Sequence, residues 1–332
     1  MSEITLNSLN LSSVRDKVVV LAGGAQGIGA ATVSTLYRAG GHVVCGDWNE
    51  DAARSYNNAL IANARDGTGS IQFVKIDISK YESQLELFDA ALKTHGRVDI
   101  AICCAAVGEQ PGWFEPESLD LESVRTVPTP LADILDINLK GSLYFTRIAL
   151  AYLRPQGPTE GRGGSRSIIL LSSVAGFKES PGLFAYSASK HGVLGIMRGL
   201  RLYTPARFNV RINVVCPWAT DTQMLGHVKR AWEAAGLPMN QPGDVARIIC
   251  ELATGEQHNG RAVFVGGGRG YDIEKGIDDL EPQWLGEEPA RALNRGQQVL
   301  GMPKPLVDED INNVAGEMDL YYIRFLATVG ER

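Results

Sequence analysis

Two side chains that could perform acid–base chemistry lie one helical turn apart near the middle of the chain. Tyr186 and Lys190 are four positions apart in a proline-free run, residues 185–200, whose composition is helical. Positions i and i+4 share a helix face, so the phenol and the ammonium group point into the same space. A nearby positive charge favours the phenolate, which would let Tyr186 exchange a proton with an alcohol or a carbonyl. Taken alone, the two residues could equally be an ordinary surface pair.

A serine at the end of an apolar run gives the pair more weight. Ser173 lies thirteen residues before Tyr186 and closes the run 167–173, which is continuous and apolar. Such a run is typical of a buried parallel strand. Ligands of open α/β sheets bind beyond the carboxyl ends of the strands. Ser173, Tyr186 and Lys190 are therefore candidate catalytic residues on one strand and the helix after it.

The spacing Ser-x12-Tyr-x3-Lys, with residues 173–176 and 186–192 around it, closely resembles the active site of the short-chain dehydrogenase/reductase family. The resemblance extends over roughly residues 15–268. It implies a Rossmann-like, doubly wound α/β domain with seven parallel strands in the order 3-2-1-4-5-6-7 and helices on both faces. It also implies that Asn138 is a fourth catalytic residue, which anchors a water in a proton relay from the lysine.

A glycine-rich turn near the N-terminus is typical of a dinucleotide site. It follows a β-branched strand, residues 17–21, and precedes a helical run, residues 30–38. Glycines permit the tight turn and the close approach of the backbone to a pyrophosphate, and the helix start offers free N–H groups. A purely structural turn is the alternative. The predicted cofactor contacts of this loop are Gly23, Gln26, Gly27, Ile28 and Gly29.

An acidic residue at the end of the second predicted strand favours NAD over NADP. Asp47 lies eighteen residues after Gly29, near the position of the acid that binds the adenosine ribose hydroxyls. An aspartate there repels a 2′-phosphate, and neither residues 24–26 nor residues 48–50 supply a cation to receive one. A simple helix cap is the alternative role. Further predicted cofactor contacts, mostly from the resemblance, are Trp48, Asp77, Ile78, Tyr186, Lys190, Pro217 and Thr222.

Two segments depart from the family pattern. Residues 103–106 read Cys-Cys-Ala-Ala where an Asn-Asn-Ala-Gly turn is usual, so the geometry of that loop is open. Trp218 replaces a glycine beside the expected nicotinamide position, and a bulky ring there suggests an apolar or aromatic substrate.

Composition bounds the class of protein. The chain has 332 residues, of which 44% are hydrophobic and 21% charged, and its net charge is −6. These values are typical of a soluble globular protein, with no basic surface for nucleic acid and no apolar run of membrane length. Five cysteines without metal-ligand spacing predict reduced thiols, a cytoplasmic location and no metal site.

Three regions are expected. Residues 1–16 form an N-terminal arm, residues 17–269 the Rossmann-fold domain, and residues 270–332 a C-terminal extension packed on the domain or on a partner subunit. The strand ending at Val265 is expected at the sheet edge, from which the extension would reach the substrate entrance. The resemblance implies a homodimer or homotetramer through the Tyr186 helix and the helix before it, with Leu143, Phe145, Ile148, Leu194, Ile196, Met197 and Leu200 as contact residues or, alternatively, as core.

The predicted reaction is reversible hydride transfer between NAD and a secondary alcohol or ketone. The substrate is expected to be a bulky apolar or aromatic molecule, a polyketide- or lipid-like compound of secondary metabolism. Three alternatives remain: an NADP-dependent carbonyl reductase, a non-redox enzyme or scaffold on the same fold, and a nucleotide-sensing protein.

Overall fold

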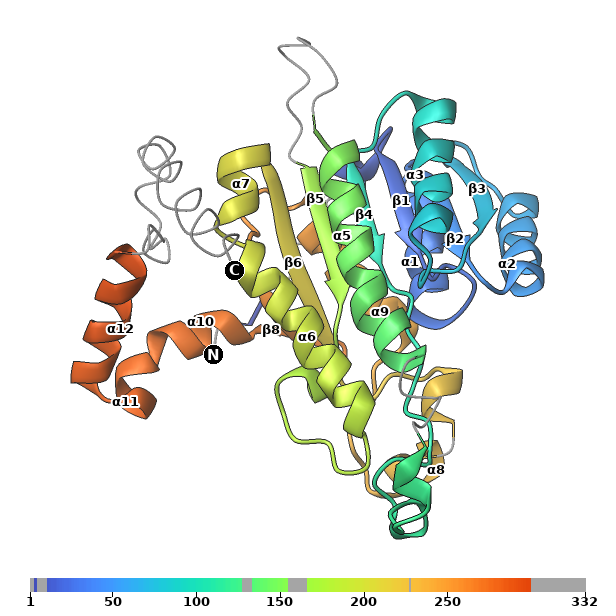
Figure 1. The fold of residues 1–332 in the computed structure, drawn as a ribbon. Coiled ribbons are helices and arrows are strands. Elements are labelled where there is room, and N and C mark those ends of the chain that lie inside the picture. Colours follow the sequence, from blue (N-terminus) through green and yellow to red (C-terminus); the bar gives the residue numbers. More distant parts are fainter. Residues whose placement is uncertain (1–2, 5–10, 127–132, 155–165, 227, 300–332) are drawn as a thin grey trace.

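Eight strands form one sheet in the computed structural model, in the order β3-β2-β1-β4-β5-β6-β7-β8 (Figure 1). The structure describes residues 3–4, 11–126, 133–154, 166–226 and 228–299. The strands are β1 Val18–Ala22, β2 His42–Asp47, β3 Ser70–Lys75, β4 Ile100–Cys103, β5 Arg166–Leu171, β6 Val210–Pro217, β7 Ala262–Gly266 and β8 Arg269–Asp272. The first seven are parallel, which confirms the predicted doubly wound sheet and its strand order.

Helices cover both faces of the sheet. α3, α5 and α6 lie in front in Figure 1, and α1, α2 and α9 pack on the other face. The longer helices are α1 Gly27–Arg38, α2 Glu50–Ala62, α3 Tyr81–His95, α5 Gly141–Tyr152, α6 Phe184–Leu200, α9 Pro242–Thr254 and α12 Glu287–Val299. Shorter ones are α7 Tyr203–Phe208, α8 Lys229–Ala234, α10 Ile273–Asp279 and α11 Glu281–Leu285.

Strand β1 shows why its run of apolar residues is continuous rather than alternating. Val18 and Val20 face the core under α3, α5 and α6, whereas Val19 and Leu21 face the core under α1 and α9. Every residue of this strand is buried. A parallel sheet with helices on both faces needs apolar side chains in both directions.

The far edge of the sheet differs from the prediction. β8 pairs antiparallel with β7, so the strand ending at Val265 is internal and not the edge. Gly267 and Gly268 have φ of +58° and +78°, which permits the tight hairpin between the two strands. The sequence shows these glycines only as the end of a strand. The expected boundary between residues 269 and 270 therefore falls inside β8.

The described part of the extension continues from β8 through α10, α11 and α12 (Figure 1). Glu274 in α10 is buried and accepts hydrogen bonds from Arg198 and Arg201 at the end of α6. Asp272 is paired with Arg261. The Glu274 pairs join the extension to the helix that carries Tyr186, and the Asp272 pair joins it to the start of β7. Residues 300–332 of the expected extension lie outside the described residues.

The apolar residues proposed for a subunit contact on α5 and α6 mostly belong to the core. Five of them are buried in the core between these helices and the sheet, so the expected subunit contact is wrong for them and the core alternative holds: Phe145, Ile148, Leu194, Ile196 and Met197. Helical spacing cannot tell which neighbour a face meets. Leu143 differs, since it is 48% exposed.

Candidate active site

The serine and the tyrosine meet where β5 passes into α6. β5 ends at Leu171, and Ser173 caps the short 3₁₀ helix Val174–Gly176, its Oγ accepting from the N–H of Ala175 at 3.2 Å. Tyr186 lies in the first turn of α6. The Ser173 side chain lies beside the Tyr186 phenol, close enough for a hydrogen-bonding interaction that lowers the pKa of the phenol. The structure thus brings together two groups thirteen residues apart in sequence.

Lys190 is buried beside the tyrosine. Its Nζ donates to the carbonyl oxygen of Leu171 at 2.9 Å and lies 5.5 Å from the centre of the Tyr186 ring. Burial lowers the pKa of Lys190 to about 8. The lysine is therefore held at a fixed position between the end of β5 and the phenol ring.

The pKa of Tyr186 is raised, which is opposite to the direction expected from the sequence. Burial disfavours the phenolate, and the hydrogen bond from Ser173 offsets only part of this effect. Lys190 does not lower the pKa of Tyr186, because the lysine has its own pKa at about 8 and is neutral at the higher pH where the phenol ionises. The i, i+4 spacing gave the common face correctly but could not give the burial.

Asn138 lies in a π-helical turn, Asp136–Lys140, directly before α5. Turns of this kind are frequent at functional sites. The side chain is fully buried, and its amide makes a pair of hydrogen bonds to the backbone of Val107, each 2.9 Å long. A third bond runs from Nδ2 to the Oγ of Ser189 at 3.1 Å. Asn138 therefore fixes the loop after β4 against α6.

Sequence reasoning missed two serines that support the catalytic residues. Ser189 donates to the carbonyl oxygen of Tyr186 at 2.7 Å and so links it to Asn138. Ser172 donates to the carbonyl oxygen of Lys190 at 2.8 Å. Their adjacency to Ser173 and Lys190 was the available signal.

Glu109 is a third missed residue, from the loop after β4. Its Oε2 accepts a hydrogen bond from the backbone N–H of Tyr186 at 2.8 Å. The N-cap residue of α6, Leu183, provides no side-chain cap. Phe114 of the same loop contacts Phe184 edge to face at a centroid distance of 5.0 Å. The loop is thus joined to the start of the catalytic helix.

The glycine loop has the shape required to hold a pyrophosphate. Gly23 has φ +88°, and a Cβ on it would lie 2.4 Å from the nitrogen of Ala105. A Cβ on Gly29 would lie 1.8 Å from the carbonyl oxygen of Gly23. A side chain at either position would collide with this backbone, so the turn requires glycine at both. Helix α1 begins at Gly27 after Gln26, without a side-chain cap, so its first N–H groups can bind an anion.

Asp47 is directed at the glycine loop. Its Oδ2 accepts from the N–H of Ala25 at 2.9 Å, and its Oδ1 accepts from the N–H of Asn49 at 3.0 Å. Both carboxylate oxygens keep lone pairs for further donors. Trp48, the next residue, is 77% exposed.

Asp77 and Ile78 follow β3, next along the same edge of the sheet. The carboxylate of Asp77 is exposed and accepts from the N–H and Oγ of Ser79 at 2.9 and 2.7 Å. Ile78 is buried, and its carbonyl oxygen accepts from Gln84. Asp77 is thus accessible to a ligand, whereas Ile78 packs in the core.

The segment after β6 reaches the glycine loop from the other side. A Cβ on Gly27 would lie 3.2 Å from the methyl carbon of Thr222. Pro217 ends β6, and the N–H of Trp218 donates to Val265 at 2.9 Å. Gly27 and Thr222, two predicted cofactor contacts from distant parts of the sequence, are therefore neighbours.

The altered turn at residues 103–106 fits closely against this site. The N–H of Cys104 donates to the carbonyl oxygen of Ala22 at 2.8 Å, and Ala105 packs on Gly23. Burial raises the pKa of the Cys103 thiol to about 11, so it stays protonated at neutral pH. The two cysteines act as small apolar packing groups.

None of the helices in the described part of the chain has the length and apolar character needed to cross a membrane. Nor does any cluster of three or more His, Cys, Asp or Glu side chains in that part of the chain have the arrangement of a metal site.

Known proteins resemble this chain in sequence and in fold. The family model described as short chain dehydrogenase matches residues 17–233. A short-chain dehydrogenase/reductase of Acremonium egyptiacum is 32% identical over 83% of this chain and 87% of its own length. The 5′-hydroxyaverantin dehydrogenase of Dothistroma septosporum is 29% identical over 88% and 96%.

Solved structures agree on the fold. A short-chain type dehydrogenase/reductase from Mycobacterium ulcerans superposes with a TM-score of 0.65, at 23% identity, over 83% of this chain and 98% of that one. A 3-ketoacyl-(acyl-carrier-protein) reductase from Brucella melitensis, solved with NADH, gives a TM-score of 0.64 at 23% identity over 77% and 98%.

Proposed function

Since the chain belongs to the short-chain dehydrogenase/reductase family, we propose that it is an NAD-dependent dehydrogenase acting on a bulky, apolar secondary alcohol or the matching ketone. Hydride-transfer oxidoreductase chemistry follows from the family. The observation that carries the alcohol and ketone chemistry is the convergence of Ser173, Tyr186 and Lys190 at the end of β5.

The residues divide the proton chemistry among them. In the oxidation, Tyr186 Oη takes the hydroxyl proton of the alcohol, and in the reduction it returns a proton to the carbonyl oxygen. Ser173 donates a hydrogen bond to the substrate oxygen and, through its bond to Tyr186, favours the phenolate. The nicotinamide ring, when bound, accepts or supplies the hydride at the carbinol carbon.

Lys190 and Asn138 support the tyrosine. Lys190 lies 5.5 Å from the centre of the phenol ring, which is a suitable place to hold the nicotinamide ribose and, when the lysine is protonated, to stabilise the phenolate. Asn138 and Ser189 hold the backbone of Tyr186. We propose that Asn138 also supports the water relay implied by the family pattern.

Three features support NAD as the cofactor. The carboxylate of Asp47 lies on the glycine loop, where it can accept both ribose hydroxyls. A phosphate at the 2′ position would approach the same negative charge. The next residues, Trp48 and Asn49, bring no cation.

A bulky apolar substrate is supported by Trp218. Its ring packs against Trp232 of α8 at a centroid distance of 5.0 Å and against Phe264 at 6.1 Å. The substrate side of the site is therefore walled by aromatic rings. Relatives named as 5′-hydroxyaverantin dehydrogenases are consistent with a substrate from secondary metabolism.

Replacement of Tyr186 by Phe tests the proposal. The variant lacks only the acid–base hydroxyl, so NADH formation from a panel of bulky secondary alcohols should fall at least ~100-fold. The Kd for NADH, measured by fluorescence, should stay near that of the wild type. Residual turnover above about a hundredth would exclude Tyr186 as the acid–base group.

A further inference from the structure

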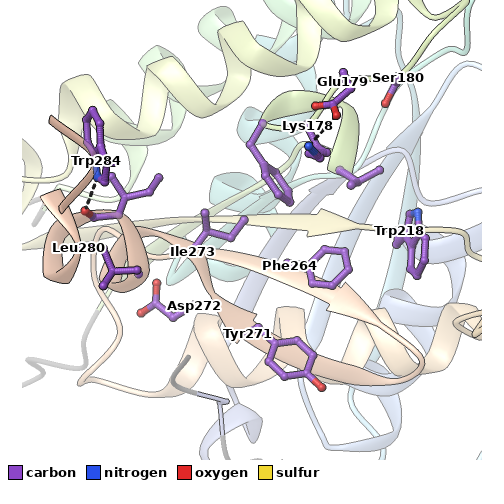
Figure 2. A pocket seen from close by; sticks show the side chains of 14 residues that line it. Lys178, Glu179, Ser180, Trp218, Phe264, Tyr271, Asp272, Ile273, Leu280 and Trp284 are labelled. Carbon is purple, nitrogen blue, oxygen red and sulfur yellow. Dashed lines mark hydrogen bonds and ion pairs between the residues drawn. The ribbon is translucent and has the colours of Figure 1, made fainter.

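An apolar pocket of about 650 Å³ lies between the 3₁₀ helix after β5, the β7–β8 hairpin and the first helices of the extension (Figure 2). Its volume is in the range of cavities that hold drug-sized ligands. The lining residues are Val174, Phe177, Lys178, Glu179, Ser180, Trp218, Phe264, Tyr271, Asp272, Ile273, Gly276, Ile277, Leu280 and Trp284.

Aromatic rings form a continuous wall of this pocket. Phe264 contacts Phe177, Trp218 and Tyr271, each at a centroid distance of 6.1 Å. Figure 2 shows Trp218 at one end and Trp284 at the other, with Phe264 between them. Aromatic faces and edges of this kind favour an aromatic ligand, because ring–ring contacts add to the burial of apolar area.

The charged groups of the lining already have partners. Lys178 and Glu179 form an ion pair with each other at 2.6 Å. Asp272 is paired with Arg261 and caps the start of α10 by accepting from the N–H of Lys275. The pocket therefore offers apolar surface and no free charge of its own, which indicates an uncharged ligand.

One end of the pocket is lined by the residues that directly follow Ser173 and Pro217 in the chain. Val174 directly follows Ser173, whose side chain is bonded to Tyr186. Trp218 directly follows Pro217, at the end of β6. A ligand body in the pocket can therefore extend from the point where Ser173 and Tyr186 would hold its oxygen.

The other end is built by the extension and leaves apolar side chains open to solvent. Trp284 and Leu280 are 59% and 47% exposed. The Trp284 ring is nevertheless fixed, since its Nε1 donates to the carbonyl oxygen of Ile277 at 3.3 Å. Fixed, exposed apolar side chains that line a pocket mark a binding surface.

We propose that this pocket holds a bulky, uncharged aromatic portion of the substrate, and that α10 and α11 complete the pocket. The assignment of this ligand as substrate rests on the proposed dehydrogenase function. Binding in the pocket covers Trp284 and Leu280, while the carbinol carbon lies at Ser173 and Tyr186.

Point substitutions are better tests than removal of the extension. Cutting the chain after Arg269 would divide β8 and delete Asp272 and Glu274, which pair with Arg261 and with Arg198 and Arg201. Trp284→Ala removes an exposed wall of the pocket and one hydrogen bond to Ile277, and keeps these ion pairs. Leu293→Ala, at a position 45% exposed on α12 and not in the lining, is the matched control.

Three alcohols separate the chemical classes: 1-(2-anthryl)ethanol, 2-decanol and 2-butanol. In the wild type, the anthryl alcohol should have the lowest KM. Trp284→Ala should raise that KM about tenfold, equivalent to ~1.4 kcal/mol, and leave the KM for 2-butanol and for NAD unchanged. Leu293→Ala should change none of them. A wild-type KM for 2-decanol equal to that for the anthryl alcohol would overturn the aromatic assignment.

Direct binding separates this proposal from the proposed function. Quenching of tryptophan fluorescence by 2-acetylanthracene gives a Kd without turnover, and Trp284→Ala should raise it about tenfold. If the protein binds 2-acetylanthracene tightly through Trp284 but turns over no alcohol, the dehydrogenase function would be contradicted. The binding role of the pocket would then still stand. If the wild type and Trp284→Ala turn over the anthryl alcohol with the same KM and bind 2-acetylanthracene with the same Kd, the role of the pocket would be contradicted. The proposed dehydrogenase function would then still stand.

Discussion

The carboxylate of Glu109 accepts a hydrogen bond from the backbone N–H of Tyr186, at 2.8 Å, across 77 residues of sequence. It provides the start of α6 with a cap that the helix's own residue, Leu183, does not supply. The other carboxylate oxygen, Oε1, is buried and has no hydrogen-bond partner among the described residues. The loop after β4 therefore holds Tyr186, the proposed acid–base group, through its backbone.

Removal of this cap should weaken catalysis through the position of Tyr186. We expect Glu109→Ala to lower kcat/KM for a secondary alcohol about tenfold, in line with the ~0.5–2 kcal/mol of a lost helix cap. Glu109→Gln keeps an acceptor oxygen and should retain most of the activity. Steady-state kinetics and the Kd for NADH, which should not change, provide the measurement. Equal activity of the alanine variant and the wild type would show that the cap has no such role.

The position of Asp47 predicts a strong preference for NAD. The wild-type kcat/KM should be at least ~100-fold higher with NAD than with NADP, a difference of ~2.7 kcal/mol, because the carboxylate accepts ribose hydroxyls and repels a phosphate. Asp47→Ser should reduce this ratio, mainly because it weakens the binding of NAD. Asp51→Ser, on the first turn of α2, is the control. If the wild type had the same kcat/KM with NAD and with NADP, Asp47 would not have the proposed role of binding the ribose.

The bond between Ser173 and Tyr186 predicts a pH effect. This bond lowers the pKa of the tyrosine, against the raising effect of burial. Oxidation needs the phenolate, so kcat/KM should rise with pH, and in Ser173→Ala the rising limb should move to higher pH. The variant should recover part of its lost activity in alkaline buffer. An unshifted pH profile would indicate that Ser173 acts only by binding the substrate.

Burial of Lys190 predicts a pH-dependent stability. Its pKa is about 8 in the folded protein and has an ordinary value of 10.5. Between these values the unfolded chain holds a proton that the folded chain lacks, so the free energy of unfolding gains from this group as pH rises from 8 to 10.5. The gain is absent below the folded pKa, where both states are protonated.

Lys190→Met should lack that contribution. Urea unfolding of the cofactor-free protein should show the wild type gaining up to ~3 kcal/mol relative to Lys190→Met across this window, at ~1.4 kcal/mol per unit of pKa shift. Comparison within the pair cancels the other groups that titrate there. Lys178→Met, at an exposed site, should follow the wild type. A constant difference between wild type and Lys190→Met would contradict the lowered pKa.

The sequence by itself determined the parts of this protein that depend on local spacing. The continuous apolar runs gave the parallel strands, since a strand buried on both faces needs apolar side chains at every position. Gly23 and Gly29 stand where any Cβ would collide with the neighbouring backbone, so the turn is readable from residue type. Tyr186 and Lys190 share a helix face by their spacing alone.

Only the tertiary structure decided the features that join distant segments. Three such contacts span long stretches of sequence: the helix cap from Glu109, the hydrogen bonds between Asn138 and Val107, and the ion pairs of Glu274 with Arg198 and Arg201. No local pattern encodes such contacts.

The direction of the Tyr186 pKa was likewise out of reach, because burial raises it and burial is a property of the whole fold. The antiparallel β8 and the aromatic pocket formed beyond it depend on where the chain turns after β7. The sequence determined the local chemistry of the site, and three-dimensional packing decided how its groups are charged, held and enclosed.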